Sequence, residues 1–331
     1  MSEPLVLAAD VGGTKSNLAL CQVTPASLEI RFDRSYPNRE FDSFEAVVRR
    51  FLADAGATAA GACCGVAGAV IDGACAMPNL GWRLSEAALA QDLGIGPVKL
   101  INDLEATALG IATLRPGDLH PLNPGRPDAQ GNRALIAAGT GLGEALLFRD
   151  GTGYRVSASE GGHVDFGPNG DEQIALLRYL AAHFGHVSYE RMVSGPGLVN
   201  IYRFLREDRG MEEFPGFMER VAGAADPAPA IAELGLARES AVCERALDLF
   251  AAVYGAAAGN LALKAMATGG LYVGGGIAPK LIDKIRDGVF MAAFLDKGRF
   301  RRLLTDVPVP VILEPKTALR GAAAHALACW D

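Results

Sequence analysis

The sequence predicts an α/β protein with two domains, and three observations lead to this prediction. Its 331 residues exceed the roughly 100–200 of an average domain. Short apolar runs alternate with segments of helical spacing in an order that mixes an antiparallel hairpin with crossover units. A polar segment rich in Pro and Gly, Arg115 to Asn132, then separates this first region from a second one that opens in the same way.

In the first region, the run LVLAAD from Leu5 predicts a buried strand, and VGGTK predicts the turn that follows it. Phe41 to Leu52 has helical spacing, and Ser85 precedes a second expected helix. Asp103 begins a third helix, expected to extend to about Leu114. Further strands are expected at 17–23, at 28–36, from Gly61, near Cys75 and at 98–102.

The second region repeats the opening pattern, because LIAAGTGLGEALLF matches VLAADVGGTKSNLAL as strand, Gly/Thr turn and strand. Residues 171–268 are expected to be mostly helical, with a long apolar helix from about Ala241 to Met266 that suits a core or an interface. The remaining elements are a strand at 271–274, a helix from Pro279, an edge-like strand from Val307 and a final helix at 317–329.

Composition excludes several classes of protein. The net charge is −7 and Lys and Arg do not cluster, which disfavours a nucleic-acid partner. The N-terminus lacks a basic signal-peptide region, and the most apolar stretch is interrupted by Asn260 and Lys264, so no membrane span is expected. None of the six cysteines forms a CxxC motif, which predicts reduced thiols in a cytoplasmic protein. Gly is abundant, at 40 residues or about 12% against a usual ~7%.

Three Gly-rich turns end buried strands and together predict a polyphosphate site: Asp10 to Lys15, Gly139 to Gly143 and Gly274 to Gly276. Glycine lets the backbone approach an anion and point N–H groups at it. Asp10 adds a carboxylate that suits Mg²⁺, directly or through water. Each turn taken alone is equally well explained as a tight hairpin. No Walker A loop and no G-x-G-x-x-G motif occur, which disfavours a P-loop or Rossmann site.

Two further groups of polar residues suit sugar chemistry. Asp103, with Asn102, lies where a strand ends and a helix begins, so it is either a helix cap or a general base for a substrate hydroxyl. Glu160 and His163 flank two glycines, and Glu190 follows farther along the chain. Carboxylates and amides can each bind two neighbouring sugar hydroxyls, and leaving such groups unpaired is costly, which makes recognition sharply specific. Zinc at His163 is disfavoured, because no Cys or second His follows it at ligand spacing.

These segments, in this order, resemble the bacterial glucokinases, within the superfamily of sugar kinases, actin and heat-shock ATPases. The matching stretches cover most of the chain: AADVGGT, INDLEA, AAGTGLG, SEGGHVDFGPN, GHVSYERMVSGPGLVNIYR, GNLAL, GGGIAPK and FLDKGRF. The resemblance implies two ribonuclease-H-like (actin/hexokinase-type) domains with mixed sheets flanking a cleft. The expected domains are residues 1–114 with 317–331, and residues 115–316.

The resemblance also implies an activity, the ATP-dependent phosphorylation of the glucose 6-hydroxyl, which feeds glycolysis, in a homodimer. It makes Asp103 the catalytic base, and Asn102, Asp103, Glu160, His163 and Glu190 the sugar ligands. Phosphate and Mg²⁺ are assigned to Ala9, Asp10, Val11, Gly12, Gly13 and Thr14 on one side, with Asp10 as the metal residue, and to Gly139, Thr140 and Gly141 on the other. Gly275 and Gly276 are expected to flank the adenosine.

Some residues depart from the family pattern. Lys15 replaces the Asn that many close relatives carry. Glu144 after GTGLG is also unusual, and its side chain either is solvent-exposed or perturbs the phosphate site. FGPNGDEQ stands where repressor–kinase relatives carry a Cys-rich zinc motif, which favours the zinc-free branch. Three alternatives stay open: a kinase for another hexose or an N-acetylhexosamine, a non-catalytic sugar- and ATP-binding regulator, and ADP or polyphosphate as the phosphoryl donor.

Overall fold

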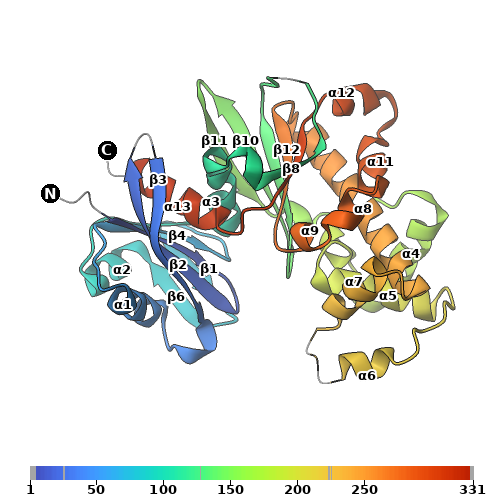
Figure 1. The fold of residues 1–331 in the computed structure, drawn as a ribbon, viewed down its shortest axis with the longest axis horizontal. Helices are drawn as coiled ribbons and strands as arrows, with labels where there is room; N and C mark the ends of the chain where they lie inside the picture. The colour runs from blue at the N-terminus through green and yellow to red at the C-terminus, as the bar shows by residue number, and fades with distance from the viewer. Residues whose placement is uncertain (1–4, 25–26, 127, 223, 225, 329–331) are drawn as a thin grey trace. The chain divides into compact units, whose positions relative to one another are not determined.

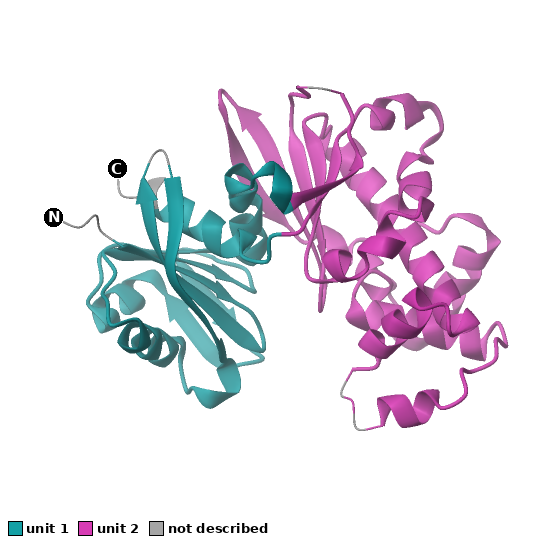
Figure 2. Cartoon of the chain, viewed as in Figure 1, with its two compact units in different colours: residues 1–118, 314–331 teal, residues 119–313 magenta. Residues whose placement is uncertain are grey.

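A computed structural model describes residues 5–24, 27–126, 128–222, 224 and 226–328. The chain divides into two compact units, which Figure 2 shows in different colours. Unit 1 comprises Met1–Asp118 and Glu314–Asp331, and unit 2 comprises Leu119–Leu313. The division therefore lies a few residues from each expected boundary, because Pro116–Asp118 forms a 3-10 turn on unit 1 before the first strand of unit 2.

Unit 1 is built on a five-stranded sheet in the order β3-β2-β1-β4-β7. β1 is antiparallel to β2 and parallel to β4, and β4 is parallel to β7, so the carboxyl ends of β1, β4 and β7 share one edge. The strands are β1 (Leu5–Val11), β2 (Lys15–Thr24), β3 (Ser27–Pro37), β4 (Gly61–Val66) and β7 (Val98–Asn102).

Both faces of this sheet are covered, because successive side chains of a buried strand point to opposite faces. Leu7 and Ala9 of β1 pack on the side of α1, α2 and the β5-β6 hairpin, whereas Val6 and Ala8 pack on the side of α3 and α13 (Figure 1). These elements are α1 (Phe44–Ala55), β5 (Ala74–Met77), β6 (Trp82–Ser85), α2 (Glu86–Leu93), α3 (Asp103–Gly110) and α13 (Thr317–Ala328), with 3-10 turns at Asn38–Glu40 and Ile111–Thr113.

Unit 2 contains a six-stranded sheet in the order β11-β10-β9-β12-β13-β8. The strand expected at an edge, β13, instead lies between β12 and β8, and the register shift beside Pro310 accommodates the missing N–H donor. The edge strand β8 comes from the Pro/Gly-rich segment that the sequence analysis assigns to a linker. The strands are β8 (Leu119–Asn123), β9 (Arg133–Ala138), β10 (Leu142–Asp150), β11 (Gly153–Ser159), β12 (Gly270–Gly274) and β13 (Val309–Ile312).

The long helix α8 (Ala241–Ala265) forms the core of unit 2. It is long and apolar enough to span a membrane, but 78% of its most apolar part is buried inside the protein, as in the core helix of a globular unit. A Cβ on Gly255 would lie 2.1 Å from the carbonyl oxygen of Phe290, so glycine lets α11 pack directly on α8.

The other helices of unit 2 lie around α8, beside the sheet (Figure 1). They are α4 (Gly170–Phe184), α5 (Gly195–Glu207), α6 (Phe217–Val221), α7 (Ala228–Leu236), α9 (Ile277–Lys280), α10 (Ile282–Ile285), α11 (Val289–Leu295) and α12 (Arg301–Thr305), with 3-10 turns η4 (Gly161–His163), η5 (Tyr189–Arg191) and η6 (Gly298–Phe300). The five cysteines among the described residues are buried thiols, and Cys329 lies outside them. The mixed α/β architecture expected from the sequence is confirmed.

Candidate active site

The parallel strands of unit 1 bring two predicted site residues to one edge of the sheet. Val11 of β1 is in register with Val66 of β4, which is in register with Asn102 of β7. Asp10 and Asp103 therefore lie at the same carboxyl edge, with β4 between their strands. This is where ligands bind in open α/β sheets. The side chains of Ala9 and Val11 are fully buried, so only their backbone is available to a ligand.

Asp10 is a partly buried carboxylate held by one neighbour on the adjacent strand. The Asn17 Nδ2 donates to Asp10 Oδ2 at 3.0 Å, because the two residues face each other in the β1-β2 register. Burial raises the pKa of Asp10 above its ordinary value of 3.8, and the Asn17 hydrogen bond and the charge of Lys15 oppose that rise. A nearby cation would favour the charged form of this group further.

The first Gly-rich turn, Gly12 to Thr14, is held by a residue that the sequence analysis missed. Asn38 is 1% exposed and makes three hydrogen bonds to the turn and to Ser16, which follows it. Its Nδ2 donates to the Gly12 carbonyl at 2.8 Å, its backbone N–H donates to the Thr14 carbonyl at 2.9 Å, and its Oδ1 accepts from Ser16 Oγ at 2.7 Å. Asn38 lies 24 residues beyond the turn and belongs to no motif, so no pattern in the sequence indicates it.

Asn102, rather than Asp103, caps helix α3. Asn102 Oδ1 accepts from the Leu104 N–H at 2.9 Å, and its Nδ2 donates to the Gly68 carbonyl at 3.2 Å. Asp103 is the first residue of the helix, and its Oδ1 also accepts from the Leu104 N–H at 2.9 Å. A carboxylate in this position interacts favourably with the positive end of the helix dipole.

Gly65 sets how closely this helix approaches the sheet. A Cβ on Gly65 would lie 2.8 Å from the Ala106 Cβ and 3.5 Å from the Asp103 Cα. The absence of a side chain therefore lets α3 begin directly against β4. No sequence motif marks Gly65, whose role depends on a helix that lies far along the chain.

In unit 2, the second Gly-rich turn joins β9 to β10 and is supported by Glu190. Glu190 Oε2 accepts from the Leu142 N–H at 2.9 Å, and a Cβ on Gly141 would lie 2.5 Å from that same oxygen. The Gly139 carbonyl accepts from the Gly195 N–H at 2.9 Å, which places the N-terminus of α5 beside the turn. The first N–H groups of α5 are used within the protein, because Gly195 donates to Gly139, Pro196 has no N–H and Gly197 donates to the Ser194 hydroxyl. The N-terminus of α5 therefore supports the turn and adds no donor to it.

Gly275 lies next to the same turn. It has a φ of +81°, and a Cβ there would lie 2.2 Å from the Ala138 carbonyl oxygen, immediately before Gly139. β12 and β9 are parallel and in register, which brings their carboxyl ends together. The structure therefore groups the predicted residues Gly139, Thr140, Gly141, Gly275 and Gly276 at one end of the unit 2 sheet.

The three predicted sugar ligands of unit 2 also lie together. His163 Nε2 is 3.9 Å from Glu160 Oε2, and His163 Nδ1 is 3.9 Å from Glu190 Oε1. Backbone pairing of the two segments brings them together, since Tyr189 N–H donates to the Val164 carbonyl at 3.2 Å and Phe166 N–H to the Val187 carbonyl at 3.0 Å. The Glu160 and His163 side chains are 79% and 58% exposed, so both are available to a ligand.

Glu144 is buried, which excludes the solvent-exposed alternative considered for it. It is 6% exposed and lies in β10, two residues beyond Leu142. Burial raises the pKa of its carboxyl above the ordinary 4.5, opposed by the charge of Lys264. The first six residues of β10 are buried or half-buried on both faces, so the sequence offered no alternation from which to orient this side chain.

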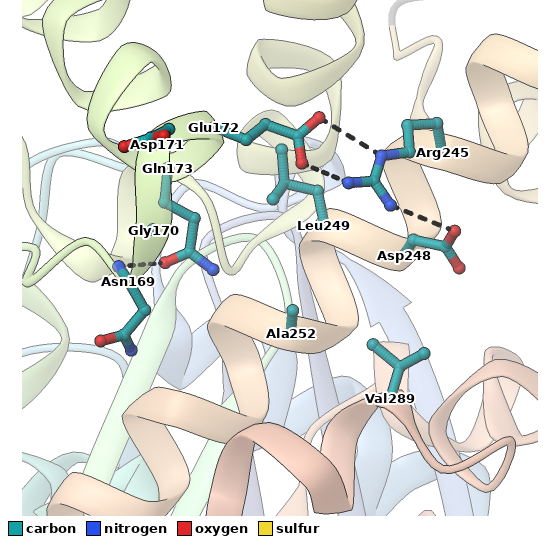
Figure 3. A pocket seen from close by; sticks show the side chains of 10 residues that line it. All are labelled: Asn169, Gly170, Asp171, Glu172, Gln173, Arg245, Asp248, Leu249, Ala252 and Val289. Carbon is teal, nitrogen blue, oxygen red and sulfur yellow. Dashed lines mark hydrogen bonds and ion pairs between the residues drawn. The ribbon is translucent and has the colours of Figure 1, made fainter. Parts of the chain in front are cut away.

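Figure 3 shows a cavity of about 310 Å³ in unit 2, away from the residues predicted for the site. It lies among α4, α8 and α11, and Asp171, Leu249 and Val289 are among its lining residues. Arg245 of α8 bonds Glu172 of α4 and lies 3.6 Å from Asp248. The pair with Glu172 connects α4 to α8. Among the described residues, no group of three or more His, Cys, Asp or Glu side chains could hold a metal ion.

Comparison with known proteins shows the family and the fold of the chain. A family model described as Glucokinase matches residues 7–328. A glucokinase from Nostoc punctiforme is 40% identical over an alignment of 333 positions that covers 96% of this chain and 98% of that protein. The crystal structure of a glucokinase from an Antarctic psychrotroph has a TM-score of 0.85 at 31% identity and covers 99% of this chain and 100% of that one.

A more distant structure shares the fold alone. It is a ROK family glucokinase from Streptomyces griseus in complex with glucose and AMPPNP, with a TM-score of 0.68, 22% identity, and coverage of 97% of this chain and 98% of that one. The fold and the grouped site residues define a sugar kinase built from two α/β units. Within that class, the chain belongs to the glucokinase family, as the resemblance of its motifs implies.

Proposed function

We propose that this protein transfers the γ-phosphoryl group of ATP to the 6-hydroxyl of D-glucose, with Asp103 as the general base. Membership of the glucokinase family supports a glucose-phosphorylating kinase. The observation that carries the proposal is the convergence of Glu160, His163 and Glu190 beside the Gly139–Gly141 turn, since it joins a sugar-reading cluster to an anion site. We also propose that the protein acts in the cytoplasm, as a homodimer, at the entry to glycolysis.

Sugar recognition is proposed for the carboxylates of Glu160 and Glu190 and for the imidazole ring of His163. A carboxylate can accept hydrogen bonds from two neighbouring hydroxyls, and His163 can donate or accept depending on its tautomer. Glu190 has one oxygen on the Leu142 N–H and the other facing His163, so its orientation is set before a sugar arrives. Such preorganised acceptors discriminate strongly against a ligand that leaves them unpaired. Asn102 of unit 1 completes the proposed set.

Asp103 is proposed to orient the glucose 6-hydroxyl and accept its proton. Phosphoryl transfer passes through a loose transition state, so positioning and charge neutralisation supply most of the catalysis. An Asp suffices as the base if the proton leaves late, and its first task is to hold the attacking oxygen in line. Because Asp103 belongs to unit 1 and Glu160, His163 and Glu190 belong to unit 2, the proposed reaction requires both units.

ATP and Mg²⁺ suit the remaining residues. The turns Gly12–Thr14 and Gly139–Gly141 are proposed to supply backbone N–H groups for phosphate, and Gly275 and Gly276 leave room for the adenosine. Asp10 supplies the hard carboxylate oxygen that magnesium prefers, and this metal commonly keeps several waters and needs only one or two carboxylates. Bound there, Mg²⁺ would neutralise phosphate charge.

The decisive experiment is a coupled assay that crosses several sugars, including N-acetylhexosamines, with ATP, ADP and polyphosphate. We expect activity with glucose and ATP, and Asp103→Ala should lower kcat by at least ~10²-fold while ATP binding is retained. Glu105→Ala, in the same first turn of α3, is the matched control and should keep near-wild-type activity. A near-wild-type rate for Asp103→Ala would contradict the assignment of the base, and phosphorylation of another sugar in preference to glucose would contradict the substrate.

A further inference from the structure

Glu144 is a buried carboxylate for which the proposed reaction has no use. Its side chain lies against Gly161, which stands between the proposed sugar ligands Glu160 and His163 in the sequence. A Cβ placed on Gly161 would lie 1.9 Å from Glu144 Oε2 and 2.6 Å from Glu144 Cδ. The Glu144 carboxylate therefore occupies the space that a side chain at position 161 would need.

The contact between Glu144 and Gly161 is part of a cluster at the base of the loop that carries the sugar ligands. Glu144 pairs with Ser159 in the β10-β11 ladder. Ser159 Oγ lies 3.4 Å from the Glu144 carbonyl, to which it donates, and accepts from the Gly161 N–H at 3.2 Å. Ser159 thus ties the backbone of Gly161 to the strand that carries Glu144.

The next loop residue is held even more tightly. A Cβ on Gly162 would lie 2.0 Å from the carbonyl oxygen of Leu142, so the loop rests directly on the backbone of β10. Leu142 is also the residue whose N–H binds Glu190. The first residues of β10 thus contact both segments that carry the sugar ligands, and Glu144 is the charged side chain among them.

A buried carboxylate is expensive to keep, because burial disfavours its charged form and an apolar residue of similar size is usually at least as stable. The charge of Lys264 opposes the rise that burial causes in the pKa of Glu144. Burial, and after it the charge of Glu144, raises the pKa of Tyr189 and Tyr254. No hydrogen bond to the Glu144 carboxylate that would explain its burial is found among the described residues. What the carboxylate does contact is the glycine of the sugar loop.

We propose that Glu144 is a positioning residue for glucose recognition, which fills the side-chain space of residue 161 and thereby holds Glu160 and His163 in place toward Glu190. This inference rests on the proposed function, because it assigns the loop to glucose. Glu144 acts through the loop and does not touch the substrate. Its loss is therefore expected to change the affinity for glucose more than the rate of phosphoryl transfer.

The proposal predicts that the two positions are coupled. Glu144→Ala empties the space and loosens the loop, whereas Gly161→Ala inserts a methyl group into space that is already filled. When the two substitutions are combined, the new methyl group occupies the vacated space, where Ser159 Oγ at 3.2 Å becomes its nearest neighbour. Contacting residues commonly show coupling worth a factor of roughly 2 to 150 in an equilibrium constant.

The test is a double-mutant cycle of Glu144→Ala, Gly161→Ala and the double variant, measured by KM for glucose, by kcat and by thermal unfolding without ligands. Each single variant should raise KM for glucose about tenfold with kcat within about threefold, and the double variant should have a KM no higher than either single one. Gly153→Ala is the matched control on the same hairpin, since a Cβ there meets only the Asp150 carbonyl, at 3.9 Å.

Three results would overturn the inference. The first is a rise in KM for the double variant that equals the product of the rises for the two single variants. The second is an unchanged KM in all variants despite altered unfolding temperatures, which would make Glu144 merely structural. Absence of glucose phosphorylation by the wild-type protein contradicts the proposed function instead. In that case the unfolding temperatures of the variants decide. If the changes of the two single variants do not add up in the double variant, the Glu144–Gly161 contact is supported. If they do add up, which is the third result, the inference is overturned.

Discussion

The two Gly-rich hairpin turns have similar sequences but are held by different kinds of side chain. In unit 1, the turn at Gly12 to Thr14 is held by Asn38, a neutral amide that is almost fully buried. In unit 2, the turn at Gly139 to Gly141 is supported by Glu190, a carboxylate whose side chain remains 29% exposed. Both supports come from segments that lie outside the hairpin.

This difference shows that a turn for phosphate can be stabilised independently of substrate recognition or together with it. Asn38 uses both polar atoms of its amide within the protein, to Gly12 and Ser16. Glu190 uses one oxygen for the turn and turns the other toward His163, in the proposed sugar site. We therefore expect that damage to the Asn38 support affects ATP alone, whereas damage to Glu190 affects both ATP and glucose.

The largest effect is expected at Glu190. Glu190→Ala removes the acceptor for the Leu142 N–H and a proposed sugar ligand, and should lower kcat/KM on the order of 10²–10³-fold, since each charged hydrogen bond contributes about 1.5–3 kcal/mol. KM should rise for both glucose and ATP. Glu190→Gln retains an oxygen for Leu142 and should raise mainly the KM for glucose. Steady-state kinetics with each substrate varied in turn measure this split.

Glu160→Gln is the control for Glu190, because Glu160 is in the same sugar cluster but does not contact the turn. It should change KM for glucose only. An unchanged KM for ATP in Glu190→Ala would show that the turn does not depend on Glu190, and the contrast between the two turns would then be lost.

A smaller effect is expected at Asn38. Asn38→Ala leaves the buried hydroxyl of Ser16 and the carbonyl of Gly12 without partners, and an unsatisfied buried group costs about 1–3 kcal/mol. We expect a loss of roughly 2–3 kcal/mol in the free energy of unfolding and a rise of about tenfold in KM for ATP, with KM for glucose unchanged. Denaturant unfolding and kinetics at saturating glucose measure the two effects.

Arg39→Ala serves as the control for Asn38, since Arg39 is the next residue of the same 3-10 turn and is exposed. It should leave both stability and kinetics unchanged. An equal rise of both Michaelis constants in Asn38→Ala would mean that the unit 1 turn is as closely linked to sugar binding as the unit 2 turn.

The shape of the two hairpins could be predicted from the sequence, because it depends on local patterns. An apolar strand that ends in Gly and Thr predicts a buried strand and a tight turn, and this holds for Leu5 to Thr14 and for Ala134 to Gly141. The shared edge of Asp10 and Asp103 follows from the same logic, since each ends or follows a parallel strand. Local order therefore predicts which site residues each unit carries.

The supports of the turns could not be predicted, because they depend on contacts between distant segments. Asn38 and Glu190 meet their turns only after the chain has folded, at separations of 26 residues from Gly12 and 48 from Leu142. The strand β8 was missed for a related reason. Its residues, Leu119–Asn123, belong to a polar, Pro-rich segment, and they form a strand only because they pair with β13.

The smallest effect is expected at Asp10, which stands beside the unit 1 turn without being one of its supports. Because burial raises its pKa above 3.8, the folded protein binds this proton more tightly than the unfolded chain does. The contribution of Asp10 to stability is therefore full below pH 3.8 and declines as the pH rises through the raised pKa of the folded protein.

Asp10→Asn keeps an oxygen for the Asn17 amide and lacks this decline. At neutral pH and without ligands this variant should therefore be slightly more stable than wild type, and the difference should vanish in acid. Unfolding across this pH range, in buffers free of Mg²⁺ and nucleotide, measures the difference. If Asp10→Asn were instead less stable at neutral pH, Asp10 would have to be counted, with Asn38, among the supports of the turn.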